Sequence, residues 1–195
     1  MGLPLVRKRF TPAEYYRLEH DAAYKSDYYE GEIYDMSGGT SGHSLIITNL
    51  SATLWNAVRK GPCRVQDSNL RVAILRTGLR TYPDVSIYCK PVEFDPEDPD
   101  LTTAVNPTVL FEVLSPTTER YDRGTKADHY RQIDSLVAYA LVWQHQPKIE
   151  IFIRSDATWQ STIATGLTAS VVVPGPGVTL SLSDVYEGVS FAEAR

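Results

Sequence analysis

The sequence predicts a single α/β domain over residues 1–195, with a central mixed β-sheet flanked by helices. Two segments, 43–59 and 118–133, have the residue pattern of helices. Apolar runs rich in β-branched and aromatic residues lie before and after the second helix and indicate strands. The order helix, strands, helix, strands is typical of a layered α/β fold, and 195 residues without visible repeats or linkers suit one domain.

The N-terminal third predicts a helix, a hairpin and a second, longer helix. Thr11-Pro12-Ala13-Glu14 is a capping box with proline at the first helical position, so a short helix should run to about His20. Residues 27–36 alternate in polarity around a glycine, which favours a hairpin. In segment 43–59 apolar residues step by four, so it forms an amphipathic helix that Gly61-Pro62 ends.

The rest of the chain is mostly strands. The expected strands cover residues 63–67, 70–75, 82–88, 107–114, 136–143 and 148–154. The helix that begins near Thr118 separates the fourth strand from the fifth. The tail is rich in glycine and proline, so it should form short strands and turns.

The composition is that of an ordinary water-soluble protein, 43% hydrophobic and 22% charged. No apolar run approaches the roughly 20 residues of a membrane span, and the N-terminus lacks the pattern of a signal peptide. Cys63 and Cys89 form no disulfide or metal framework, so we expect two reduced thiols and a cytoplasmic protein. The net charge of −5 argues against coating nucleic acid by bulk electrostatics but leaves local binding open.

Two charged segments each have an ordinary and a functional interpretation. Arg64, Arg71, Arg76 and Arg80 fall within 17 residues and could line a groove, or they could be solvated residues of strand edges and turns. The acidic stretch 93–100 lacks the alternation of a calcium-binding loop. Its two prolines favour a solvated loop instead.

Glu112 shares one face of a predicted strand with Leu110 and Leu114, where burial of a carboxylate is energetically unfavourable. Burying an unpaired carboxylate costs several kcal/mol, so Glu112 must meet a cation, a proton or hydrogen-bond donors. Asp84 is a second acid within a mostly apolar segment, near the start of the predicted strand 82–88. Two acids on two apolar strands indicate a bound metal ion, although a structural pair with a buried arginine is the alternative.

The expected metal is Mg²⁺ or Mn²⁺, held by Asp84, Glu112 and the backbone carbonyl of Val113. Mg²⁺ takes oxygen ligands and keeps several waters, so one or two carboxylates and a substrate phosphate suffice. Hydrolysis also benefits from a fixed cation near the developing charge. Lys126 is the candidate, because it shares a helix face with Tyr130 that should look towards the sheet. Its removal is expected to lower turnover while leaving folding nearly intact.

Several motifs in order resemble those of one family. They are Tyr82-Pro83-Asp84-Val85, then Phe111-Glu112-Val113-Leu114-Ser115-Pro116-Thr117-Thr118, then Arg123-Gly124-x-Lys126-x-x-x-Tyr130. The set resembles the Uma2 family of restriction-endonuclease-like proteins, within the PD-(D/E)XK nuclease superfamily. The resemblance runs from about Phe10 to Arg154 and includes Gly31-Glu32 and Gly42-His43.

The resemblance implies a restriction-endonuclease-like fold and roles for two further residues. Glu32 matches the family's first acid and would hold a metal-bound water, unless it is an ordinary hairpin acid. His43 would contact a phosphate or orient a carboxylate, unless it only caps its helix. The superfamily's usual lysine position is here Leu114, so the resemblance implies a lysine moved onto the next helix, at Lys126.

The function expected from these residues is Mg²⁺- or Mn²⁺-dependent hydrolysis of DNA phosphodiester bonds. The resemblance implies a homodimer that acts on DNA, with no organic cofactor and no membrane. A serine hydrolase is excluded, because the sequence has no Gly-x-Ser-x-Gly. No tryptophan lies near either acid in the sequence, which argues against a glycosidase. The alternative is a catalytically silent protein of nuclease fold that binds DNA or a protein partner.

Overall fold

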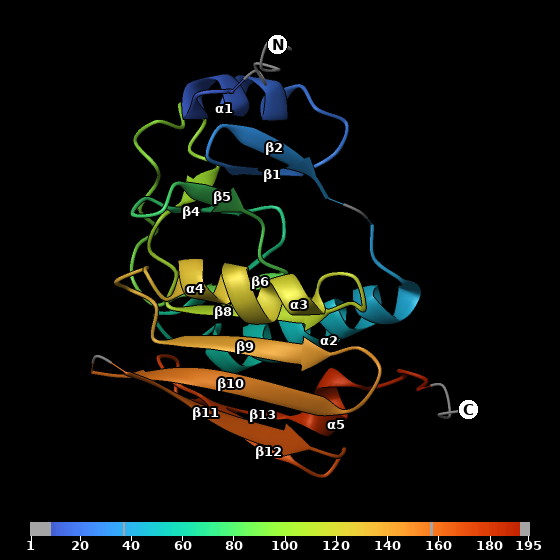
Figure 1. Cartoon of the computed structure of the whole chain (residues 1–195). Coiled ribbons are helices and arrows are strands. Elements are labelled where there is room, and N and C mark those ends of the chain that lie inside the picture. Colours follow the sequence, from blue (N-terminus) through green and yellow to red (C-terminus); the bar gives the residue numbers. More distant parts are fainter. Residues whose placement is uncertain (1–8, 37, 157, 192–195) are drawn as a thin grey trace.

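The structure is a computed structural model that describes residues 9–36, 38–156 and 158–191. Two β-sheets lie one above the other, and a helical segment packs between them (Figure 1). The mixed α/β class is therefore confirmed, but the strands form two large sheets and a hairpin instead of one sheet. In the part of the chain described, no helix has the length and apolarity needed to cross a membrane.

The lower sheet has six strands and contains the central strand of the fold. Its order is β11 (Thr158–Thr165), β10 (Lys148–Ser155), β9 (Ala138–Trp143), β8 (Val109–Leu114), β6 (Val85–Tyr88) and β3 (Arg64–Asp67). Strand β8 pairs antiparallel with β6 and parallel with β9, so the sheet is mixed as predicted. All six residues of β8 are buried, which explains its continuous apolar run.

The upper sheet has five strands and carries the N-terminal helix. Its order is β2 (Glu32–Asp35), β1 (Ser26–Tyr29), β5 (Leu79–Thr81), β4 (Arg71–Ile74) and β7 (Thr103–Ala104). The capping box predicted for α1 (Pro12–His20) is present in full. The predicted hairpin is also present, with Glu30 and Gly31 at positive φ in its turn.

Helices cover both faces of the lower sheet. The predicted long helix is α2 (Ser41–Val58), whose apolar side packs on one face together with α5 (Leu182–Val185) and the hairpin of β12 (Ser170–Val173) and β13 (Val178–Ser181). The other face is covered by a helical segment of three parts, α3 (Glu119–Tyr121), η1 (Asp122–Lys126) and α4 (Ala127–Tyr130). A second apolar cluster fills the space between this segment and both sheets.

The middle part of this segment, η1, is a π-helical turn. In a regular α-helix a row of residues four apart drifts around the axis, because 3.6 residues make one turn. The wider π turn offsets that drift. Asp122, Lys126 and Tyr130 are therefore all buried on the inner side, although the first and the last are eight positions apart in the sequence.

The predicted strand 82–88 is shorter in the structure, where β6 covers only Val85–Tyr88. Strand β5 ends at Thr81 in the upper sheet, and β6 begins at Val85 in the lower sheet. Pro83 lies between them and has no backbone N–H to donate to a strand ladder. The break carries the chain from one sheet to the other and leaves Asp84 immediately before β6.

Two of the arginines are buried, so neither interpretation of their cluster is right for them. Arg71 lies 3.8 Å from Asp98, and Arg80 pairs with Asp95 at 2.9 Å. Asp95 and Asp98 are themselves buried, so the expectation of a solvated acidic loop is wrong for both. These ion pairs fasten the acidic stretch to the upper sheet, beside the tyrosines under α1.

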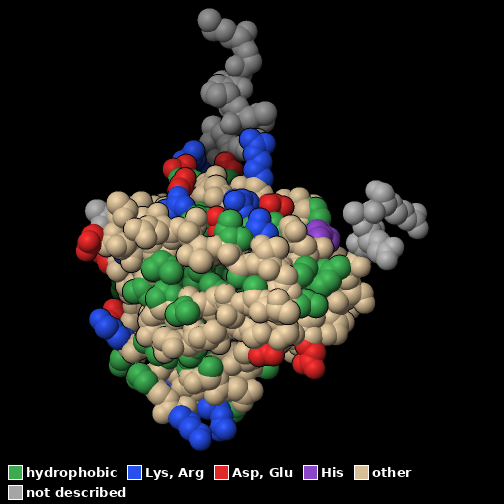
Figure 2. Space-filling model, turned by 90° about the horizontal axis from the view of Figure 1, so that it is seen from below, with side chains coloured by type: hydrophobic (Ala, Val, Ile, Leu, Met, Phe, Trp, Pro, Cys, Tyr) green, Lys and Arg blue, Asp and Glu red, His purple; other side chains and the backbone are tan. Residues whose placement is uncertain are grey.

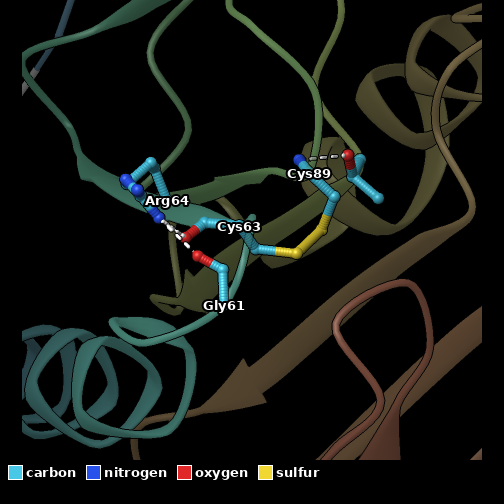
Figure 3. Close-up of a disulfide and its surroundings, with 5 residues drawn as sticks. Gly61, Cys63, Arg64 and Cys89 are labelled. Atoms are coloured by element: carbon cyan, nitrogen blue, oxygen red, sulfur yellow. Dashed lines mark hydrogen bonds between the residues drawn. A yellow bond between two sulfur atoms is a disulfide. The ribbon is translucent and has the colours of Figure 1, made fainter.

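Cys63 and Cys89 are joined by a disulfide, so the expectation of two reduced thiols is wrong. Figure 3 shows the bridge beside the ends of β3 and β6, which pair antiparallel with Arg64 opposite Tyr88. Arg64 lies next to it and donates to the carbonyls of Gly61 and Cys63, both at 2.8 Å. Arg64 is exposed and closes the turn before β3, which fits the interpretation of a solvated residue at a strand edge.

The lower end of the molecule is seen from below in Figure 2. Hydrophobic side chains gather in patches on this face, and charged side chains lie mainly at its margins. Strands β11 and β12 belong to this end and expose Ile163 and Val172. Because a nucleic-acid backbone is bound through lysine and arginine, the arrangement does not favour a phosphate-binding face here.

We predict that the disulfide contributes to stability. Reducing it should lower the free energy of unfolding by about 3 kcal/mol, the loop-closure value for this order of sequence separation. The measurement is denaturant unfolding with and without a phosphine reductant. A Cys63→Ala/Cys89→Ala double variant should not respond to the reductant. Two reactive thiols in the unfolded but unreduced protein would contradict the bridge.

Candidate metal centre

The pairing of β6 with β8 brings the two predicted acids together. Val85 lies opposite Phe111, so one step further along the antiparallel register Asp84 lies opposite Glu112. Residues opposite each other in a sheet share a face and have Cβ atoms about 5 Å apart. The Asp84 carboxylate also accepts a hydrogen bond from the amide of Val113 at 2.7 Å, which fixes it against β8.

Glu112 meets a cation and a hydroxyl, as its burial requires. Its Oε1 accepts from Lys126 Nζ at 2.8 Å and from the Tyr130 hydroxyl at 2.7 Å. Both contacts fall on the same oxygen, and no described residue donates to Oε2. Burial, followed by the charges of Asp122 and Asp84, raises the pKa of Glu112 well above its ordinary value, against the opposing effect of Lys126.

Lys126 points into the protein, as predicted from the helix face. Its side chain is only 5% exposed, and its ammonium lies 2.8 Å from Glu112 and 3.7 Å from Asp122. Burial lowers the pKa of Lys126, but the charges of Glu112, Asp122 and Asp27 outweigh burial and raise the pKa overall. The side chain is therefore a fixed positive charge, and the partner of Glu112 is a lysine instead of the arginine considered as the alternative.

His43 lies in the first turn of α2, where the Thr40 hydroxyl accepts from its backbone amide. Its ring Nε2 is 2.9 Å from the carbonyl oxygen of Val113 and 3.6 Å from Asp84 Oδ2. A carbonyl only accepts hydrogen bonds, so Nε2 carries the proton here. His43 therefore holds the backbone immediately after Glu112 and places its Nε2–H group beside the Asp84 carboxylate.

Burial is also the main influence on Asp84. It raises the pKa of the carboxyl, while His43 and the Val113 amide act in the opposite direction. An anion held in such a site gains from any further positive charge. A divalent cation supplies that charge directly.

A cavity of about 280 Å³ lies in front of these groups. It is bounded by the loop Gly38–Thr40, the turn Ser115–Thr118 and the side chain of Gln144. Five of the predicted site residues line it, namely His43, Asp84, Glu112, Val113 and Lys126. Glu32 is not among the lining residues, because it lies on β2 in the upper sheet, where it accepts from the Tyr34 hydroxyl at 2.9 Å.

Sequence reasoning missed two polar residues of the cavity. Asp122 precedes Lys126 by four residues, a spacing that places both on one face of a helix, so its signal was present in the sequence. Gln144 follows β9 and accepts from the Thr40 hydroxyl at 3.1 Å. Its signal was weak, because a polar residue after a strand usually marks the start of a loop.

The residues present fit a hard divalent cation. Asp84 and Glu112 offer carboxylate oxygens, and the Val113 carbonyl has a second lone pair besides the one that faces His43. Among the described residues no group of three or more His, Cys, Asp or Glu side chains could hold a metal ion. The protein therefore offers a small oxygen set, which suits Mg²⁺ or Mn²⁺ completed by water and phosphate.

A model of the Uma2 family, described as "Putative restriction endonuclease", matches residues 12–190. The chain belongs to the Uma2 family. Two curated proteins of Synechocystis sp. (strain ATCC 27184 / PCC 6803 / Kazusa) are similar to it. The uncharacterized protein slr1290 is 32% identical over 184 residues, 94% of each chain. The uncharacterized protein sll1609 is 29% identical over 172 residues, 88% of this chain and 96% of its own length.

A solved structure shares the fold of this Uma2 chain. It is the crystal structure of "a putative nuclease belonging to DUF820" from Anabaena variabilis ATCC 29413. The TM-score is 0.73 at 18% identity, over 91% of this chain and 97% of that one. The family resemblance and the fold expected from the motifs are thus confirmed.

The burial of Lys126 changes the expectation that its removal leaves folding intact. Lys126→Met should lower the free energy of unfolding by about 3–5 kcal/mol, because it leaves a buried carboxylate without its cation. Denaturant unfolding of the metal-free protein measures this loss. Adding Glu112→Gln to the variant should restore part of it.

The matched control is Lys60→Met, at an exposed position just after α2. It should change stability by less than about 0.5 kcal/mol. A loss for Lys126→Met as small as that of the control would show that the ion pair does not contribute to folding.

Proposed function

We propose that this protein hydrolyses DNA phosphodiester bonds with a Mg²⁺ or Mn²⁺ ion bound by Asp84 and Glu112. The proposal is carried by one observation. The carboxylates of Asp84 and Glu112 and the buried ammonium of Lys126 line the same cavity. Membership of a family whose model is described as "Putative restriction endonuclease" supports it. A homodimer, with one site for each DNA strand, is part of the proposal, because two-fold symmetry suits the cutting of both strands.

Each residue has a separate task in this scheme. A bound ion would polarise a phosphoryl oxygen and make water more nucleophilic. Asp84 is oriented for the ion by the Val113 amide and His43. Glu112 keeps Oε2 available while Tyr130 holds Oε1.

Lys126 supplies the fixed positive charge for the phosphoryl group. Leu114, at the superfamily's usual lysine position, is buried in the apolar cluster between the sheets and carries no charge. The π turn instead directs Lys126 from the helix towards the same carboxylate. Such a preorganised donor stabilises negative charge in the transition state at little reorganisation cost.

One observation favours the silent alternative. Lys126 and Tyr130 both engage Glu112, and the carboxylate is 5% exposed, so a phosphodiester has little direct access to it. A protein that retained this ion pair would have a nuclease fold without turnover. It would then act by binding DNA or a protein partner.

We predict cleavage of at least one DNA form in the presence of Mg²⁺ or Mn²⁺. The assay incubates the protein with supercoiled, linear, branched and single-stranded DNA across divalent metals. Asp84→Asn and Glu112→Gln should each abolish cleavage and weaken metal binding, which calorimetry measures separately. Asp35→Asn, an exposed acid on β2, is the control and should cut like wild type. Metal binding without cleavage of any substrate would favour the silent alternative.

Lys126→Met should lower single-turnover cleavage by about 10²-fold or more, the scale of one lost transition-state donor. The reaction is measured at a temperature where circular dichroism shows the variant folded. Lys60→Met is the control for loss of a positive charge. If folded Lys126→Met cleaves DNA at the wild-type rate, Lys126 has no role in catalysis.

A further inference from the structure

Asp27 is a half-buried acid on β1, and its strand face looks towards the helical segment. Neighbouring residues of a strand point to opposite faces. Tyr28 points to the α1 side, where its ring stacks on Tyr15 at 5.0 Å. Tyr29 points to the opposite side and packs against the ring of His129 in α4 at 4.8 Å. Asp27, two residues before Tyr29, shares its face and therefore points towards the segment that carries Lys126.

Two buried polar atoms on this face have no hydrogen-bond partner in the described residues. They are Oδ1 of Asp27 and Oγ1 of Thr81. Tyr28 pairs with Arg80, so the register places Asp27 opposite Thr81, one residue before the cavity-lining Tyr82. Buried polar groups are nearly always satisfied, so an unpaired carboxylate oxygen here calls for an explanation.

Among the charged groups that act on Asp27, Lys126 has the largest effect on its pKa. Burial raises the pKa of Asp27, and the positive charge of Lys126 is the foremost influence that lowers it. The reverse effect is present too, because Asp27 is among the three carboxylates that raise the pKa of Lys126. Glu112 and Asp122 thus lie within 4 Å of one ammonium, and Asp27 acts on the same ammonium from the neighbouring sheet, with a buried Oδ1 that has no hydrogen-bond partner among the described residues.

A cation bound to Glu112 would disturb this arrangement. Without a bound cation, the ammonium of Lys126 lies closest to Glu112, at 2.8 Å, and farther from Asp122, at 3.7 Å. A divalent ion on Glu112 would repel the ammonium, because like charges a few ångströms apart in a protein interior interact strongly. The ammonium then needs another acceptor, or it competes with the metal for Glu112.

We infer that Asp27 is a positioning residue that, together with Asp122, holds the ammonium of Lys126 when Glu112 binds a divalent cation. The inference rests on the proposed metal site. In this state the Asp27 oxygen that has no partner attracts the ammonium of Lys126 and keeps it beside the cavity, while the Glu112 carboxylate coordinates the ion. Asp27→Asn keeps the shape and removes the charge, so it tests the idea directly.

The experiment measures Mg²⁺ affinity by calorimetry, without DNA, in a double-mutant cycle. Its members are wild type, Asp27→Asn, Lys126→Met and the double variant, with Asp35→Asn as a control for loss of an acid on the neighbouring strand. Asp27→Asn should weaken Mg²⁺ binding by about 10-fold more in the presence of Lys126 than in its absence, since coupling of that size is typical for interacting groups. The part that remains without Lys126 is direct attraction between Asp27 and the ion.

An equal effect of Asp27→Asn in both backgrounds would overturn the inference, because Asp27 would then act only as a distant charge. Mg²⁺ binding to wild type with no effect of Asp27→Asn would also overturn it, while leaving the metal site in place. No Mg²⁺ binding to wild type would overturn both the inference and the proposed metal site.

A second measurement does not depend on the stability of Lys126→Met. The buried ammonium of Lys126 should give a slowly exchanging lysine signal in nitrogen NMR. In wild type the signal should persist after Mg²⁺ is added. In Asp27→Asn it should be present before Mg²⁺ and lost by fast exchange afterwards. Equal protection of the Mg²⁺-bound wild type and Asp27→Asn would contradict a positioning role.

Discussion

The ion pair between Glu112 and Lys126 is the interaction on which the rest of the site depends. Strand β8 is buried on both faces, so the carboxylate of Glu112 has little access to water. Removing two charges from water costs several kcal/mol for each ion, which only close contact and added hydrogen bonds offset. The Tyr130 hydroxyl provides such a bond. The sheet, the helical segment and the tyrosine must therefore be placed together for either charge to be tolerated.

Two local irregularities make this placement possible. The break at Pro83 ends one strand and begins the next, so Asp84 enters the lower sheet opposite Glu112. The π turn brings Lys126 into line with Asp122 and Tyr130 on the inner side of the helical segment. Irregular backbone of both kinds is often found at functional sites, because regular elements leave no room to redirect a side chain. Here the break at Pro83 places Asp84 beside Glu112, and the π turn places Lys126 beside the same carboxylate.

The sequence was most informative where periodicity and burial agree. The apolar run around Glu112, the spacing of the long helix and the capping box of α1 each correspond to an observed element. Long-range pairing was not predictable in the same way. Nothing local marks Asp95 and Asp98 as partners of buried arginines, or Cys63 and Cys89 as neighbours across two strands. The candidate site followed the same rule, since Asp84, Glu112 and Lys126 could be predicted, whereas Asp27 comes from a sheet that the sequence did not reveal.

The charge balance of the cavity gives a physical reason for a metal ion. Three carboxylates, those of Asp84, Glu112 and Asp122, line the cavity with one ammonium, that of Lys126, so the ionised groups leave a formal excess of two negative charges. Asp27 adds a further negative charge that acts on Lys126 from the neighbouring sheet. Burial raises the pKa of Asp27, Asp84 and Glu112, because an ionised carboxylate is less favourable where it has little contact with water. A phosphodiester would add a further negative charge to this excess. A divalent cation offsets the carboxylates and gives the phosphate a favourable partner, so the same ion that satisfies the buried acids would admit the substrate.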